Sequence, residues 1–254
     1  MLKSIYVFAV ILLISSCTTT KQAGLMSSIQ DAQLKEVLTK ALDAMGGYEN
    51  WNNIKSLQFQ KKITLYDASG TIEKTTDQKH VYTFQPENKV NITWTEEGVV
   101  NEMIMENGEV RKLKNGQIDT EASLTSLKNS IYASTFVIGV PFKLLDEGAQ
   151  LSYEGTKMLA SGKKVHVIKA VYNPAAYKKH TKADVWWHYF DEQSYQQLGY
   201  TVQLHDHSSY IENLSFDRVD GFLFTATRNS WLVDANGNNL YVKAGYEYGK
   251  YEVN

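Results

Sequence analysis

The sequence predicts an α+β fold in which one strongly curved antiparallel sheet packs against an N-terminal helix and a central helical lid. About ten segments show the period-two alternation or β-rich composition of strands, and turn residues separate them. Residues 121–148 are the only long non-strand segment inside a chain that is otherwise full of strands. A sheet of about ten strands rarely stays flat, so we expect it to curl.

The first 17 residues have the features of a targeting segment. Lys3 precedes an apolar stretch over residues 5–14, which ends in Ser15, Ser16 and Cys17. This ending resembles the lipobox of bacterial lipoproteins, which implies cleavage before Cys17 and lipidation of its thiol and amine. An ordinary signal peptide with a chance cysteine is the alternative. The chain contains 1 cysteine, so an internal disulfide is excluded. Because that cysteine lies at the anchor position, we also expect no cysteine nucleophile.

The mature chain is expected to hold one domain. Residues 18–28 are small and polar, as in a tether, and residues 29–254 contain no internal linker and no repeat. The formal net charge of −2 gives no general attraction to nucleic acid. We therefore expect no nucleic-acid partner.

The N-terminal helix is predicted from its caps and its apolar face. Ser27 and Ser28 are candidate caps, and Gly46 and Gly47 end the pattern. One face carries the apolar residues that should cover the sheet: Leu34, Val37, Leu38, Ala41, Leu42 and Met45.

An antiparallel meander follows the helix. Residues 57–65 alternate between apolar and polar side chains, although Lys61 interrupts the apolar face. A second alternating segment covers residues 89–94. The pairs Asn107-Gly108 and Asn115-Gly116 predict tight hairpins, because both residues tolerate positive φ angles.

The stretch from residue 121 to 148 is the predicted lid. Leu124, Leu127 and Ile131 have helical spacing and lead into an apolar run over residues 136–142. Pro141 disfavours one continuous helix, and the run is too short to span a bilayer, which needs about 20 apolar residues. We expect two short helices, or a helix and a loop, that either fill a core or close an apolar cavity.

Four more hairpins are predicted after the lid. Their turns lie around Ser161-Gly162, residues 191–193, Asp220-Gly221 and Asn236-Gly237. The last strand covers residues 241–253 and is rich in tyrosine.

Three short motifs in this order resemble the lipoprotein-localisation (LolA/LolB-like) superfamily. They are ALDAMGG at residues 41–47, followed by Trp51 and Ile54, then PFKLLD at 141–146 and VWWHYFD at 185–191. The resemblance covers most of residues 29–254 and implies an incomplete barrel whose open side is closed by helices over an apolar cavity. Superfamily members carry acyl chains or lipoproteins. The soluble carrier has no anchor, so this chain looks more like an anchored acceptor or a lipid-binding relative.

Aromatic and aliphatic side chains on the strands and the lid are the candidate cavity lining. Each of them is also compatible with an ordinary core position, and which of Trp186 and Trp187 faces inward is left open. The candidates are Phe59, Trp94, Phe136, Ile138, Phe142, Leu144, Trp187, Phe222 and Phe224.

A metal site is the main catalytic alternative. On a strand His205 and His207 would share a face, and Glu212 or His188 would have to complete the set. We favour an exposed polar loop, because Ser208 and Ser209 follow the pair and a zinc site needs three or four ligands. Since the sequence also lacks a nucleophile elbow and a phosphate loop, we predict no metal, no cofactor and no catalytic residues.

The sequence is therefore interpreted as an envelope lipoprotein that binds an apolar small molecule or lipoprotein acyl chains. We expect the lipid anchor on Cys17 to attach the protein to a membrane. Thr18, which stands where an inner-membrane retention Asp would be, points by the same resemblance to the outer membrane, facing the periplasm. The alternatives are a metal-dependent enzyme built on residues 188–212 and a protein-interaction module with a filled interior.

Overall fold

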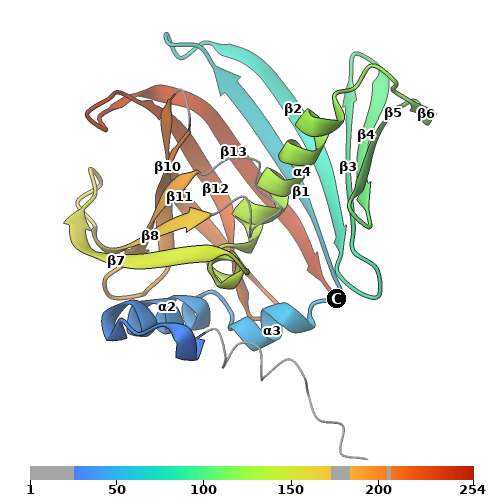
Figure 1. Cartoon of the computed structure of the whole chain (residues 1–254). Coiled ribbons are helices and arrows are strands. Elements are labelled where there is room, and N and C mark those ends of the chain that lie inside the picture. The colour runs from blue at the N-terminus through green and yellow to red at the C-terminus, as the bar shows by residue number, and fades with distance from the viewer. Residues whose placement is uncertain (1–25, 173–183, 205–206) are drawn as a thin grey trace, which may run out of the picture.

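The computed structural model describes residues 26–172, 184–204 and 207–254, and these residues form one 13-stranded antiparallel sheet (Figure 1). The strands are β1 (Ser56–Tyr66), β2 (Ile72–Thr83), β3 (Lys89–Glu96), β4 (Val99–Glu106), β5 (Glu109–Lys114), β6 (Gln117–Ile118), β7 (Ala149–Met158), β8 (Lys164–Tyr172), β9 (Val185–Asp191), β10 (Gln197–Gln203), β11 (Ser208–Val219), β12 (Phe222–Val233) and β13 (Asn239–Val253).

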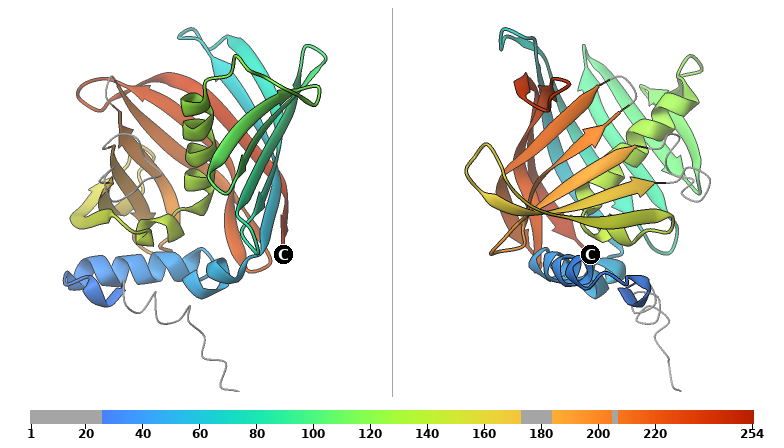
Figure 2. Two further views of the ribbon diagram at one scale, coloured as in Figure 1. Left: turned by 45° about the vertical axis from the view of Figure 1, so that its right-hand side comes forward. Right: turned by 60° about the vertical axis from the view of Figure 1, so that its left-hand side comes forward.

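The sheet is built from two meanders. Strands β1 to β6 form one, strands β7 to β13 form the other, and pairing of β1 with β13 joins them. The sheet curves strongly (Figure 2). It does not close into a barrel, because the described edge strands β6 and β7 do not pair with each other. This arrangement confirms the predicted fold class.

The lid runs between the two edges. Helix α4 (Leu124–Gly139) and the 3-10 helix η1 (Phe142–Leu145) connect β6 to β7, and α4 crosses the concave face of the sheet (Figure 2). The predicted break at Pro141 is present, because α4 ends at Gly139 and η1 begins at Phe142. No helix within the described residues is both long and apolar enough to span a membrane.

Helices α2 (Ala32–Ala44) and α3 (Tyr48–Asn53) cover one end of the curved sheet (Figure 1). The cap of α2 is Asp31, whose carboxylate accepts hydrogen bonds from the backbone N–H groups of Gln33 and Leu34. The predicted caps Ser27 and Ser28 are therefore wrong. Asp31 is favoured because its side chain reaches two of the free N–H groups of the first turn.

Gly46 connects α2 to α3 at a position that admits no side chain. Its φ is +123°, and an added Cβ would lie 2.5 Å from Cδ1 of Phe222. The sequence predicted the end of α2 here but did not predict α3.

Strand β2 is the largest element that the sequence analysis missed. Of its 12 residues only His80 and Tyr82 are buried, so the apolar alternation that marks a strand is almost absent. The predicted Asn-Gly turns are confirmed, since Asn107 and Asn115 both have positive φ angles of 52° and 49°.

Two apolar clusters lie on opposite faces of the sheet. The main core fills the concave face between the strands, α2 and α4. A smaller cluster on the other side joins Val165, Val167 and Tyr189 of β8 and β9, with Trp187 packed against it.

Candidate ligand-binding site on the concave face

The end of the concave face nearest α2 and α3 is lined with aromatic rings. On β12, Phe222 and Phe224 have ring centroids 5.8 Å apart, and Phe224 stacks on Tyr251 of β13 at 4.5 Å. Phe59 of β1 lies 5.5 Å from the same Tyr251 ring. Neighbouring strands thus form a continuous aromatic wall, because inward-facing residues of paired strands lie side by side.

The C-terminal end of the lid is anchored on this wall. Phe142 of η1 stacks on Trp51 of α3 with centroids 4.7 Å apart and an interplanar angle of 10°. Phe142 also meets Phe222 edge-on at 6.4 Å. Gly139 permits the close approach, since an added Cβ would lie 3.3 Å from the Trp51 ring and 2.9 Å from the Lys143 side chain.

Phe136 connects the last turn of α4 to the C-terminal meander. Its ring centroid lies 4.8 Å from Trp186 of β9 and 5.5 Å from Tyr172 of β8. Trp186 therefore faces the interior. Trp187, one residue further along the strand, points to the opposite face because side chains alternate along a strand.

A small cleft of about 70 Å³ remains between α4 and the N-terminal meander. A bound water needs roughly 10–15 Å³ in the same kind of measure, and ligand pockets usually exceed about 300 Å³. The cleft is thus too small for a lipid unless α4 moves. Its lining includes Trp51, Tyr82, Phe84, Val90, Met105, Tyr132, Phe136 and Ile138.

Most of the predicted lining residues meet on this face. Phe59, Phe136, Phe142, Leu144, Phe222 and Phe224 belong to the main core, and Ile138 packs against it. Trp94 lies further along β3, with the ammonium of Lys112 5.9 Å from its ring centroid. Trp187 lies in the outer cluster, so the alternation along β9 places it away from the predicted cavity.

Two cations face the interior beyond the aromatic wall. The Lys61 ammonium of β1 lies 5.2 Å and 5.9 Å from the ring centroids of Tyr246 and Tyr248 on β13. The Arg228 guanidinium of β12 lies 4.8 Å and 5.0 Å from the same two rings. The pairings Lys61–Tyr248 and Arg228–Tyr246 across adjacent strands hold this group together. We call these four residues the cationic cluster.

The cationic cluster contains no counter-ion within the described part of the chain. Arg228 is 6 % exposed, and its Nε has no hydrogen-bond partner there, nor has the hydroxyl of Tyr248, which is 8 % exposed. The contrast with β5 is clear, because Lys112 and Lys114 both form ion pairs with Asp119, at 3.3 Å and 3.1 Å. Cation–π contacts with the tyrosines offset only part of the desolvation cost of two charges.

Burial, and then the nearby Arg228 charge, lower the pKa of Lys61 from its usual value to about 7. Both effects disfavour the ammonium form. The sequence marked Lys61 as a break in an apolar alternation, but it did not identify Arg228. The signal available in the sequence was a charged residue, Lys61, at a position of β1 where the alternation calls for an apolar side chain.

Two histidines inside the sheet are kept neutral. Burial lowers the pKa of His188 to about 3, and burial followed by the Lys61 charge lowers the pKa of His80 to about 2. His80 is held by Tyr82 at 2.9 Å and by Gln78 at 3.0 Å. His188 contacts Gln197 at 3.0 Å.

The proposed metal set is not assembled in this region. His188 faces the interior, whereas Glu212 follows the inward-facing Ile211 on β11 and so points to the outer side. Among the described residues no three potential ligands lie close enough to share an ion. His180 and His205 lie outside the described residues.

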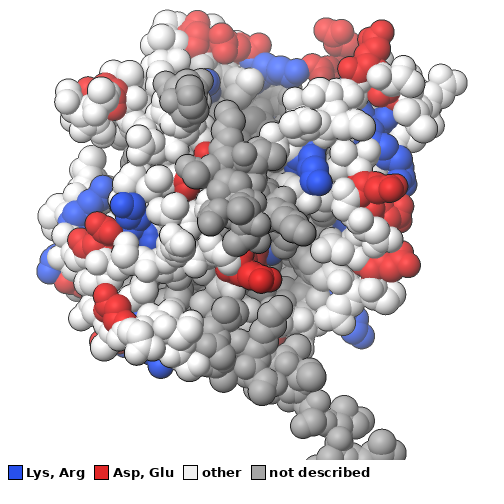
Figure 3. All heavy atoms as spheres, in the orientation of Figure 1, with Lys and Arg blue, Asp and Glu red and all other residues white. Residues whose placement is uncertain are grey.

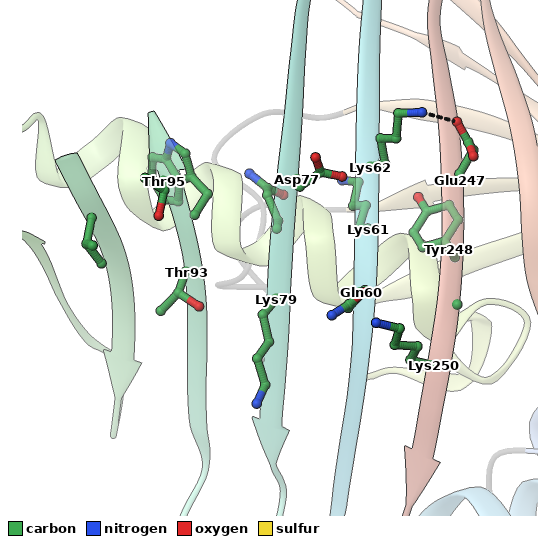
Figure 4. Close-up of a pocket in the computed structure, with 14 residues that line it drawn as sticks. Gln60, Lys61, Lys62, Asp77, Lys79, Thr93, Thr95, Glu247, Tyr248 and Lys250 are labelled. Carbon is green, nitrogen blue, oxygen red and sulfur yellow. Dashed lines mark ion pairs between the residues drawn. The ribbon is translucent and has the colours of Figure 1, made fainter. Parts of the chain in front are cut away.

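The convex side of β1, β2, β3 and β13 bears a shallow polar hollow of about 530 Å³ (Figure 4). Lys62 on this side forms an ion pair with Glu247 at 2.9 Å, while α4 lies behind the sheet in this view. Figure 3 shows a different side of the molecule, in the orientation of Figure 1, and acidic and basic side chains are interspersed there too. Exposed pairs of this kind contribute about 0–1 kcal/mol and do not define a site.

Solved structures share this architecture of a curved, unclosed sheet covered by a helix. The LolA superfamily protein NE2245 from Nitrosomonas europaea is 8% identical, with a TM-score of 0.54, and the match covers 87% of this chain and 93% of that one. A Vibrio parahaemolyticus domain described as an outer membrane lipoprotein-sorting protein is 7% identical, with a TM-score of 0.53 and coverage of 86% and 91%. The chain therefore has a LolA-like fold, as the motifs suggested.

The chain belongs to the family described as "Family of unknown function (DUF6503)", which matches residues 5–222. Among curated proteins the sequence has no match.

Proposed function

We propose that this protein is a lipid-anchored protein of the bacterial envelope that binds an apolar ligand between the concave face of its sheet and α4. The ligand class is an acyl chain, a lipid or the acyl anchor of another lipoprotein. The observation that carries the proposal is the aromatic wall beneath a helix that joins the two unpaired edges of an unclosed sheet. The LolA-like fold supports it at the level of architecture.

The anchor part of the proposal rests on the sequence around Cys17, which lies outside the described residues. We expect the wild-type protein to partition into the membrane fraction and a Cys17→Ala variant to leave it. A soluble wild type with unmodified Cys17 in its mass spectrum would contradict the anchor and the envelope localisation. Thr18 and the lipoprotein-sorting fold relative support the outer membrane as the target.

Ligand binding requires α4 to move away from the N-terminal meander, because the cleft beside it is small. Lids belong to the less stable parts of a fold, so we expect faster amide exchange in residues 134–145 than in β8. Addition of palmitate should slow exchange in the lid and leave β8 unchanged. Equal protection of both segments without any response to palmitate would reject the proposal.

A variant that fills the cleft provides an independent test. Ile138 lines the cleft, so Ile138→Trp should weaken binding of a fluorescent fatty-acid probe. Ile72→Trp is the matched control, because Ile72 is 61% exposed at the start of β2. Mass spectrometry of lipid extracted from the purified protein would identify the natural ligand.

A catalytic role has no comparable support. The interior histidines are neutral at physiological pH, and His188 and Glu212 lie on opposite sides of the sheet. The protein-interaction alternative would use the outer cluster around Tyr189. If the protein binds the acyl probe and substitutions in the outer cluster do not change that affinity, the result would argue against the protein-interaction alternative.

A further inference from the structure

We propose that the cationic cluster of Lys61, Arg228, Tyr246 and Tyr248 binds the anionic head group of the ligand. The ligand would be an acyl chain that ends in a carboxylate or a phosphate. This inference rests on the proposed function and specifies the chemistry of what is bound.

The cluster has the donors that such a head group requires. The guanidinium of Arg228 and the ammonium of Lys61 flank the same two tyrosine rings, from β12 and β1 on either side of β13. Arg228 and Tyr248 are each more than nine-tenths buried, and the Nε and hydroxyl groups have no partner among the described residues. A planar guanidinium is suited to paired hydrogen bonds with a carboxylate or phosphate.

A bound anion would lower the electrostatic energy of the cationic cluster. Unpaired charges are costly in a protein interior, and two cations within 6 Å of one ring also repel each other. No carboxylate of the described residues forms an ion pair with either cation, whereas the lysines of β5 share Asp119. An anionic head group would supply the missing charge and accept the unused hydrogen bonds.

The cluster is also continuous with the aromatic wall that would hold the acyl chain. The ring of Tyr248 lies 6.0 Å from Phe59, and Phe59 lies 5.5 Å from Tyr251. Tyr251 stacks on Phe224, which leads to Phe222 near η1. From Arg228 to Phe222 along β12 is about 20 Å at the usual rise per strand residue, which is the length scale of a fatty acyl chain. The head group would therefore lie at the cationic cluster and the tail would follow β12 toward η1.

The test compares ligands that differ only in their head group. Protein stripped of lipid is titrated with palmitate and with 1-hexadecanol, by displacement of a fluorescent acyl probe. We expect wild type to bind palmitate roughly tenfold or more tightly than hexadecanol, as a hydrogen bond to a charged group implies. Arg228→Met and Lys61→Met should each remove about that factor for palmitate and leave hexadecanol binding unchanged.

Lys62→Met is the matched control for Lys61→Met, because its side chain lies on the convex side with Glu247 (Figure 4). It should not change either affinity. If Arg228→Met fails to fold, Arg228→Gln and Lys61→Gln give the same comparison, because each removes the charge and keeps a polar side chain. Titration with lysophosphatidic acid distinguishes the two head groups, since tighter binding than palmitate would assign the site to a phosphate.

Equal affinity of wild type for palmitate and hexadecanol, with no effect of Lys61→Met, would overturn the head-group inference and leave the proposed function intact. Failure of palmitate, hexadecanol and lysophosphatidic acid to bind would instead reject the proposed function, and the inference with it.

Discussion

The two ends of the concave face are built on the same strands but have opposite energetic character. At the end near α2 and α3, every ring packs against other rings, as Phe142 does against Trp51 and Phe222. At the other end, Lys61 and Arg228 lie against the rings of Tyr246 and Tyr248 and have no ion-pair partner among the described residues. β1 and β12 each contribute to both ends.

This difference indicates that the aromatic end of the face contributes mainly to stability and the cationic end mainly to ligand binding. Close-packed aromatic side chains stabilise a fold through apolar burial and dispersion contacts. Buried charges without a counter-ion destabilise the free protein, and such a cost is retained when the group serves a ligand. Substitutions at the aromatic end should therefore lower stability, while neutral substitutions at the cationic end should raise the stability of the free protein.

The largest effect is expected at Phe142, which is buried between α3 and β12. Phe142→Ala should lower the free energy of unfolding by about 3–5 kcal/mol, through lost transfer energy and a residual cavity. Urea denaturation of the two proteins measures the change. Phe142→Leu, which keeps most of the volume, should cost clearly less. A loss below about 1.5 kcal/mol for Phe142→Ala would show that the anchored end of the lid is open, and the comparison would fail.

An effect of opposite sign is expected at Arg228. Arg228→Met keeps an unbranched apolar stem and removes the buried charge, so the ligand-free protein should become more stable by about 1–3 kcal/mol. Arg218→Met is the control, because Arg218 is exposed at the end of β11 and should change stability by less than about 0.5 kcal/mol. Destabilisation by Arg228→Met would mean that the guanidinium holds the tyrosines in place and that the cluster is structural.

A smaller, pH-dependent effect is expected at Lys61. Its pKa is about 7 in the folded protein, below the ordinary value of 10.5, so between these values the unfolded chain binds more protons than the folded one. Stability therefore rises with pH in this window, and the penalty is fully present below pH 7. Between pH 7 and 9, wild type should gain roughly 1–2 kcal/mol relative to Lys61→Met.

Thermal or urea unfolding at several pH values measures this gain. The titratable and charged groups near the Lys61 ammonium are His80 of β2, Arg228 of β12, and Tyr246 and Tyr248 of β13. Burial lowers the pKa of His80 to about 2 and raises the pKa of Tyr248 above its ordinary value. His80, Arg228 and Tyr248 therefore each keep one protonation state between pH 7 and 9. Lys62→Met should follow wild type, and parallel curves for wild type and Lys61→Met would show that Lys61 is solvated.

Local chemistry was sufficient to predict the elements that depend on neighbouring residues. The Asn107-Gly108 and Asn115-Gly116 turns, the end of α2 at Gly46 and the break at Pro141 follow from backbone preferences that act over a few residues. The alternation over residues 57–65 placed Phe59 and Lys61 on one face of a strand, and the structure has them so.

Only the tertiary structure decided which residues meet. Strand β2 is recognised by its hydrogen bonds to β1 and β3 rather than by apolar residues, because most of its side chains are exposed. The orientation of Trp186 and Trp187 depends on the register of β9 with its neighbours. Lys61 and Arg228 come together because the last strand inserts between β1 and β12, a long-range pairing that no local pattern encodes. The sequence by itself thus determined the kind of sheet and the polarity of its faces. The cationic cluster forms only in the tertiary structure, because β13 pairs with β1 on one side and with β12 on the other.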